Sequence, residues 1–107
     1  MKTYIKEFLE NYIAKFEEMK IEIDSLILFG SQARGDAILS SDVDIAVVMK
    51  TPLTSEERGS LRCLGEDIDD SIETNLFFTT RQAIEDSARI FDTNKYIKEE
   101  GVVLWPR

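Results

Sequence analysis

Histidine is absent from this sequence, and cysteine occurs only once, as Cys63. Without histidine the chain lacks the most common general base and the most common zinc ligand in proteins. Acid–base chemistry must therefore fall to carboxylates, and any bound metal should be a hard ion that prefers oxygen ligands. A lone cysteine cannot form an internal disulfide, which fits a reducing compartment and predicts a cytoplasmic location.

Long apolar runs are also missing. No stretch approaches the roughly 20 apolar residues that span a bilayer, so no membrane association is expected. The first residues, Met1 to Tyr4, lack the apolar core of a signal peptide, and nothing points to export. A chain of 107 residues that is 43% hydrophobic is long enough for one core, which predicts a single domain spanning residues 1–107.

Basic residues are scarce relative to acidic ones. Thirteen Lys and Arg residues stand against 21 Asp and Glu residues, so the formal net charge is −8. A phosphodiester backbone would repel such a chain, and direct nucleic-acid binding is not expected.

Helix-like and strand-like patterns alternate along the chain. Residues 2–20 have apolar side chains at helical spacing, and a second helix is expected from Thr54 or Ser55 to Ile68. Strands are predicted at 26–29, 42–48 and 73–79, with a small closing strand at 102–105. Thr80 is predicted to cap a helix over residues 81–90, and Thr93 to begin a short helix that ends at Gly101. This alternation indicates an α/β or α+β domain with a small mixed sheet flanked by helices.

The most informative stretch is LILFGSQARGDAILSSDVDIAVVM, residues 26–49. The short apolar run 26–29 predicts a buried strand that breaks at Gly30, and Ser31 is expected to cap the helix that follows. A strand that turns through Gly-Ser into a helix leaves free backbone N–H groups. The usual anion at such a turn is phosphate.

Ten residues separate Ser31 from the first of two carboxylates on the next predicted strand. Asp42 and Asp44 are two positions apart, so they should point to the same face. The alternatives are that Asp42 is a turn residue and that Asp44 is a charge on an edge strand. The run Ile45 to Val48 has the pattern of a strand buried on both faces, which makes the second alternative poor. Beside a phosphate-binding turn, these carboxylates indicate a magnesium–nucleotide site.

The combination of Gly30-Ser31 with Asp42-Val43-Asp44 resembles the signature of the polymerase-β-like nucleotidyltransferase superfamily. The longer string FGSQARGDAILSSDVDIAVV is similar to the minimal nucleotidyltransferases (MNT), which are short members without a second substrate-binding domain. The likeness extends to the N-terminal helix and to the tail Ile97 to Leu104. The resemblance implies a polymerase-β-like nucleotidyltransferase fold.

The resemblance also implies roles for individual residues. Gly30 would let the backbone approach a triphosphate, Ser31 would hydrogen-bond it, and Arg34 would lie near the phosphates. Asp42 and Asp44 would hold Mg²⁺ bridging the phosphates of ATP, as catalytic and metal-binding residues. For Arg34, a solvated helix residue is an equally good interpretation.

One position departs from the family pattern. A third acidic residue is expected from the next strand, and its place here is taken by Asn75, whose amide cannot ionise and binds magnesium weakly. Glu73 shares that strand face and is the alternative. The pattern therefore predicts nucleotide binding, whereas catalysis depends on whether Asn75 or Glu73 can replace the third acidic residue.

Three functions remain open. The leading hypothesis is a protein adenylyltransferase that moves AMP from Mg-ATP to a hydroxyl of a partner. The family resemblance implies that this partner is a HEPN-family toxin. The chain would act as its antitoxin, form a hetero-oligomer with it, and modify it by transfer of AMP (AMPylation). The second hypothesis is an antitoxin with weak or no activity that neutralises its partner by binding. The third is a small-molecule nucleotidyltransferase acting as a homodimer.

Overall fold

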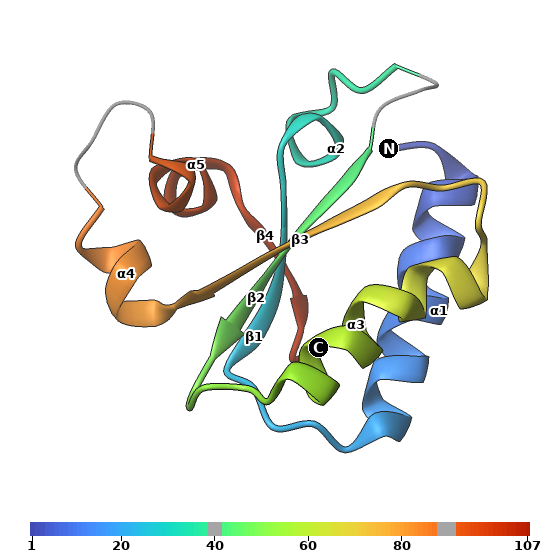
Figure 1. The fold of residues 1–107 in the computed structure, drawn as a ribbon. Coiled ribbons are helices and arrows are strands. Elements are labelled where there is room, and N and C mark those ends of the chain that lie inside the picture. The colour runs from blue at the N-terminus through green and yellow to red at the C-terminus, as the bar shows by residue number, and fades with distance from the viewer. Residues whose placement is uncertain (39–41, 88–91) are drawn as a thin grey trace.

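The computed structural model describes residues 1–38, 42–87 and 92–107 (Figure 1). Its elements, in chain order, are α1 (Thr3–Met19), β1 (Ser25–Phe29), α2 (Ser31–Arg34), β2 (Val43–Met49), α3 (Ser55–Ile68), β3 (Thr74–Thr80), α4 (Arg81–Glu85), α5 (Thr93–Glu100) and β4 (Val102–Trp105). Within these described ranges, no helix has both the length and the apolar character that a membrane span requires.

The four strands form one sheet in the order β3-β2-β1-β4. β2 and β3 run parallel, whereas β1 is antiparallel to both β2 and β4. This arrangement confirms the predicted α/β fold with a small mixed sheet, and it confirms the closing strand at 102–105.

Helices cover both faces of the sheet: α1 and α3 lie on one side, and α4 and α5 lie on the other (Figure 1). Side chains alternate between the two faces along a strand, and β2 is buried at Val43 and from Ile45 through Val48, so residues that point to either face are covered. The main core lies under α1 and α3. Its buried members are Ile5, Phe8, Leu9, Tyr12, Phe16, Ile23, Leu26, Leu28, Val43, Ile45, Val47, Leu53, Leu61 and Leu64.

α1 and α3 are joined by a buried hydrogen bond. The Tyr12 hydroxyl donates to the Leu61 carbonyl at 3.2 Å, and burial raises the pKa of this phenol. α3 itself begins with a capping box, in which the Thr54 hydroxyl accepts from the Glu57 N–H and the Glu57 carboxylate accepts from the Thr54 N–H. The predicted start of this helix is thereby confirmed.

Several predicted boundaries need correction. The helix predicted over 81–90 ends at Glu85, and residues 88–90 lie outside the described part of the chain. Ser87 supplies the physical reason, because its hydroxyl donates to the Ile84 carbonyl at 2.7 Å and competes with a further helical turn. The N-cap of α2 is Gly30, not Ser31, which is the first helical residue.

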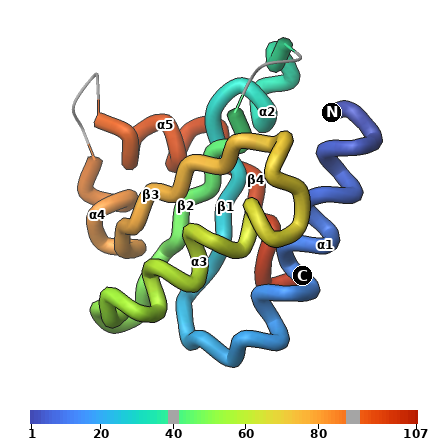
Figure 2. The backbone as a smooth tube through the Cα atoms, turned by 45° about the vertical axis from the view of Figure 1, so that its right-hand side comes forward, coloured from blue at the N-terminus to red at the C-terminus, as the bar shows by residue number. Residues whose placement is uncertain are grey.

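β2 and β3 are shifted by one residue from their predicted limits, and β1 begins one residue earlier than predicted. β2 begins at Val43, so Asp42 lies just before the strand, and β3 covers Thr74–Thr80. Because β2 and β3 are parallel and β1 is antiparallel to β2, the starts of β2 and β3 and the end of β1 meet at one end of the sheet (Figure 2). Gly30 connects the end of β1 to the start of α2 here, so the predicted phosphate-binding turn lies at this end of the sheet.

Candidate active site

Asp42, Asp44 and Asn75 converge at this end of the sheet. The parallel register pairs Asp44 with Asn75. The Asn75 amide nitrogen Nδ2 donates to Oδ2 of Asp42 at 2.8 Å and to Oδ1 of Asp44 at 3.3 Å. The two carboxylates therefore point to one side, as their spacing predicts, and a single neutral amide lies between them.

Asp44 is short of positive partners. Its carboxyl is half-buried, and burial raises its pKa, an effect that the negative charge of Asp42 reinforces. The hydrogen bond from Asn75 and the charge of Arg34 act in the opposite direction but do not cancel the rise in pKa. A carboxylate in this condition gains from any cation placed between it and Asp42.

The donor set fits a magnesium ion held jointly with a nucleotide. Within residues 1–38, 42–87 and 92–107, no group of three or more His, Cys, Asp or Glu side chains is placed to hold a metal. Mg²⁺ does not need such a cage, because it is usually bound by one or two carboxylates together with substrate phosphates and water. Asp42 and Asp44 provide that number of carboxylates, with hard oxygen donors.

Gly30 packs directly against Asp44. Its backbone has φ +76° and ψ −156°, a conformation that residues with a side chain rarely adopt. A Cβ atom at this position would lie 2.4 Å from Oδ2 of Asp44. Glycine is therefore required both by the turn and by the close approach of the carboxylate, which brings the turn and the acidic pair into one site.

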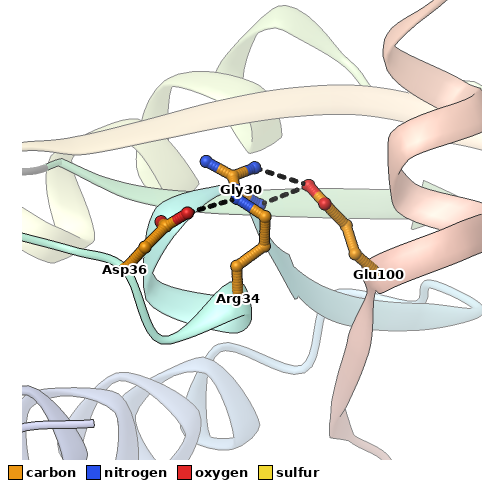
Figure 3. A network of polar contacts seen from close by, with 4 residues as sticks. All are labelled: Gly30, Arg34, Asp36 and Glu100. Carbon is orange, nitrogen blue, oxygen red and sulfur yellow. Dashed lines mark hydrogen bonds and ion pairs between the residues drawn. The ribbon is translucent and has the colours of Figure 1, made fainter.

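Arg34, the last residue of α2, contacts two acidic side chains next to the Gly30 turn. Its Nε donates to Oδ2 of Asp36 at 3.0 Å, and its Nη1 donates to Oε1 of Glu100 at 3.0 Å (Figure 3). The same Glu100 oxygen accepts the Gly30 N–H at 3.3 Å. The hydrogen bond to Asp36, with the charges of Asp36 and Glu100, raises the pKa of the guanidinium, which is positively charged at every relevant pH.

Ser31 and Glu73, the other residues singled out from the sequence, lie at the edges of this arrangement. Ser31 is half-buried at the first position of α2, and its carbonyl accepts the N–H groups of Gly35 and Asp36. Glu73 has its carbonyl bonded to the Val43 N–H at 2.9 Å. Its exposed side chain makes no hydrogen bond or ion pair with any described residue, so the structure brings Asn75, rather than Glu73, to the two aspartates.

Sequence reasoning missed Glu100. This residue is 70 positions from Gly30, ends α5, and comes directly before Gly101. A Cβ atom at Gly101 would lie 2.4 Å from the Ile97 carbonyl oxygen and 2.6 Å from Cγ2 of Ile27 in β1. This tight packing of the end of α5 against β1 carries Glu100 to the turn. The only local signal was the glycine that ends the helix.

Comparisons with known proteins place the chain in a family. The family model described as "Polymerase beta, Nucleotidyltransferase" matches residues 6–101. The chain is also similar to a solved structure, "Crystal structure of the toxin-antitoxin with AMP-PNP", with 26% sequence identity and a TM-score of 0.62. That likeness covers 90% of this chain and 72% of the other.

A weaker structural likeness is to a presumed nucleotidyltransferase from Sulfolobus solfataricus. The two share 19% identity with a TM-score of 0.46, over 94% of this chain and 76% of the other, which is too little to bear on fold or function. No curated protein matches the sequence significantly. The family match spans nearly the whole chain and includes the turn, both aspartates and Asn75. The chain therefore belongs to the polymerase beta nucleotidyltransferase family.

Proposed function

We propose that this chain transfers AMP from Mg-ATP to a hydroxyl group on a partner protein, as a minimal nucleotidyltransferase domain comprising residues 1–107. The observation that carries the proposal is the convergence of Asp42 and Asp44 beside the Gly30 turn, with Arg34 reaching the same place. Members of this family transfer nucleotides, and the pattern of donors here suits a triphosphate that carries a divalent ion.

The binding end of the site consists of groups that attract phosphate oxygens. The Gly30 N–H and the Arg34 guanidinium are donors, and Ser31 follows directly in the chain. Asp42 and Asp44 would hold Mg²⁺, which neutralises charge on the phosphates and on the leaving pyrophosphate when it is bound. Asp44 is held in place by strand pairing and by the Asn75 amide, so its carboxylate is oriented before ligand arrives.

In the transfer step, the hydroxyl oxygen of the acceptor bonds to the α-phosphorus of ATP. The bond from that phosphorus to the bridging oxygen breaks, and pyrophosphate leaves with the bonding electrons. The hydroxyl proton must pass to a carboxylate or to water, because the Asn75 amide has no basic site for it. We therefore expect slow transfer compared with an enzyme that has a carboxylate at this position.

The partner is proposed to be a HEPN-family toxin, with this chain as its antitoxin and a tyrosine as acceptor. Two likenesses support this proposal: the sequence resembles minimal nucleotidyltransferases, and the chain is similar to a structure described as a toxin-antitoxin with AMP-PNP. The net charge of −8 complements a basic ribonuclease and would speed association with it.

The test is incubation of the chain with α-labelled ATP, Mg²⁺ and the protein encoded beside it. We expect label on the partner, and none when Asp42 and Asp44 are both replaced by Asn. A matched control replaces two exposed acids of α3, Glu56→Gln with Asp67→Asn, which changes the net charge equally and should leave labelling intact. Absence of label on the partner with the unaltered chain would count against transfer.

Neutralisation by binding alone is the second candidate, and Asn75 is the observation that favours it. Its amide donates to both carboxylates, so the position of the expected third acid is occupied by a hydrogen-bond donor. The Asp42→Asn/Asp44→Asn variant separates the two functions. If it still suppresses the ribonuclease, occlusion explains neutralisation; if suppression disappears while the complex still forms, transfer explains it.

A further inference from the structure

Glu100 occupies donors that the nucleotide needs. Its Oε1 accepts the Gly30 N–H at 3.3 Å and a hydrogen of Arg34 Nη1 at 3.0 Å (Figure 3). These are the backbone donor of the turn and the one arginine assigned above to the phosphates. A carboxylate oxygen on these two donors has the charge and the hydrogen-bonding character of a phosphate oxygen.

The contact is built into the fold. Only 20% of the Glu100 side chain is exposed, although its donors lie at the surface of α2. The close packing of Gly101 against Ile27 and the Ile97 carbonyl fixes the end of α5, so Glu100 is presented to α2 from a constrained position. The neighbouring acid Glu99 differs: it is 58% exposed and its carboxylate lies 3.7 Å from Lys95 on its own helix.

We propose that Glu100 is an intramolecular competitor for the phosphates, which ATP must displace from the Gly30 N–H and from Arg34 in order to bind. This inference rests on the proposed function. Two like-charged groups cannot share one N–H and one guanidinium nitrogen, so nucleotide binding moves the Glu100 side chain aside. The affinity of the free chain for ATP is thereby held lower than its donor set alone would give.

The alternative role is a brace that holds Arg34 and the turn in position for the phosphates. The two roles predict different changes in ATP affinity when Glu100 is replaced. A brace is retained by Glu100→Gln, which keeps an acceptor oxygen, and is lost in Glu100→Ala, which weakens binding. A competitor is weakened by loss of its charge in either variant, so both variants bind more tightly.

The experiment is calorimetric titration of the unaltered chain and of Glu100→Gln, Glu100→Ala and Glu99→Gln with Mg-ATP and with inorganic tripolyphosphate. Removing a unit negative charge next to a phosphate should tighten binding of both ligands by about tenfold or more in the two Glu100 variants. The gain should shrink at high salt. Glu99→Gln, which also removes one negative charge, should leave affinity unchanged.

The outcomes distinguish this inference from the proposed function. If the unaltered chain binds ATP and neither Glu100 variant binds it more tightly, the proposal that Glu100 competes with the phosphates is overturned, and the proposal of nucleotide binding stands. An equal gain in Glu99→Gln also overturns it, because net charge then explains the effect. If no variant binds either ligand, both proposals fall.

A second measurement needs no substitution. The ¹³C signal of the Glu100 carboxyl, followed by NMR while tripolyphosphate is added to the unaltered chain, should move toward the position of a free carboxylate. The Glu99 signal should remain where it is. A Glu100 signal that stays fixed while the phosphates bind would overturn the proposal even if the Glu100 variants failed to fold.

Discussion

Asp24 and Asp44 lie at opposite ends of the same sheet and are in opposite electrostatic states. Asp24 precedes β1, and its N–H is bonded to the Val48 carbonyl near the end of β2. Its carboxylate accepts hydrogen bonds from Arg81, and from the Ser25 hydroxyl at 3.0 Å. These contacts, the Arg81 hydrogen bond above all, lower the pKa of Asp24.

At the other end, Asp44 has no such ion-pair partner in contact among the residues that the structure describes. Burial raises its pKa, its neighbour Asp42 is also an acid, and the group between them is an amide. One end of the sheet thus contains a satisfied ion pair, and the other contains an excess of negative charge. The opposite pKa shifts indicate that ionisation of Asp24 is favoured by the fold and that ionisation of Asp44 is disfavoured, a pattern typical of a site that binds a cation.

The largest expected effect comes from breaking the turn that crowds Asp44. Gly30→Ala forces a side chain into a positive-φ conformation and places a Cβ atom on the Asp44 carboxylate. We expect a loss of about 1–3 kcal/mol in unfolding free energy, together with loss of ATP binding. Chemical denaturation and calorimetry measure the two effects.

The matched control is Gly59→Ala in α3, where an added Cβ meets nothing within 4 Å. It should be neutral or stabilise the fold by about 0.5–1 kcal/mol, because alanine favours a helix. If Gly30→Ala were as harmless as this control, the positive φ and the contact with Asp44 would have no energetic importance.

Asp42 and Asp44 were predictable as a pair because side chains two positions apart on an extended chain point to the same side. The place of Asn75 beside them was implied by the family resemblance and not by this alternation. The alternating elements likewise predicted the mixed sheet. Glu100 was not predictable, because its contact depends on how α5 packs on β1, 70 residues from the turn. The early end of α4 was missed for a related reason: the competing hydroxyl of Ser87 acts against the helical pattern before it.

The next effect concerns the neutral group between the acids. Asn75→Asp removes a donor shared by Asp42 and Asp44 and adds a third negative charge, so the ligand-free protein should lose about 1–2 kcal/mol. Magnesium should restore that stability, because it binds the folded state preferentially. Thermal melts with and without Mg²⁺ provide the measurement.

Transfer to the partner should also become faster in Asn75→Asp, by about a hundredfold where the new carboxylate can accept the proton. Glu73→Gln is the companion variant and should change little, since the Glu73 side chain is exposed and makes no hydrogen bond or ion pair with Asp42 or Asp44. If Glu73→Gln were the damaging substitution, Glu73 rather than Asn75 would supply the third group.

A smaller effect of opposite sign is expected from Asp44→Asn. The amide retains the shape of the carboxylate and removes both the cost of burying the charge and the repulsion from Asp42. The ligand-free protein should gain about 0.5–1 kcal/mol, a rise in Tm of about 2–8 °C for a domain of this size, while magnesium-dependent ATP binding is lost. A variant less stable than the unaltered chain would mean that the Asp44 charge supports the fold.

The smallest effect tests the satisfied end of the sheet. The pKa of Asp24 is lowered in the folded protein, so its ionised form stabilises the fold at pH values above about 3.9, the unfolded value, and this contribution is lost as pH falls through the lower folded value. Arg81→Gln removes the cation. Because the Arg81 side chain is 64% exposed, the loss of unfolding free energy at pH 7 should be only about 0.2–1 kcal/mol.

Denaturant unfolding of the unaltered chain and of Arg81→Gln from pH 7 down to pH 2 should show this difference in stability closing in acid. A difference that persisted at pH 2 would assign the effect to packing of the Arg81 chain rather than to its charge, and Asp24 would no longer be the stabilising counterpart of Asp44.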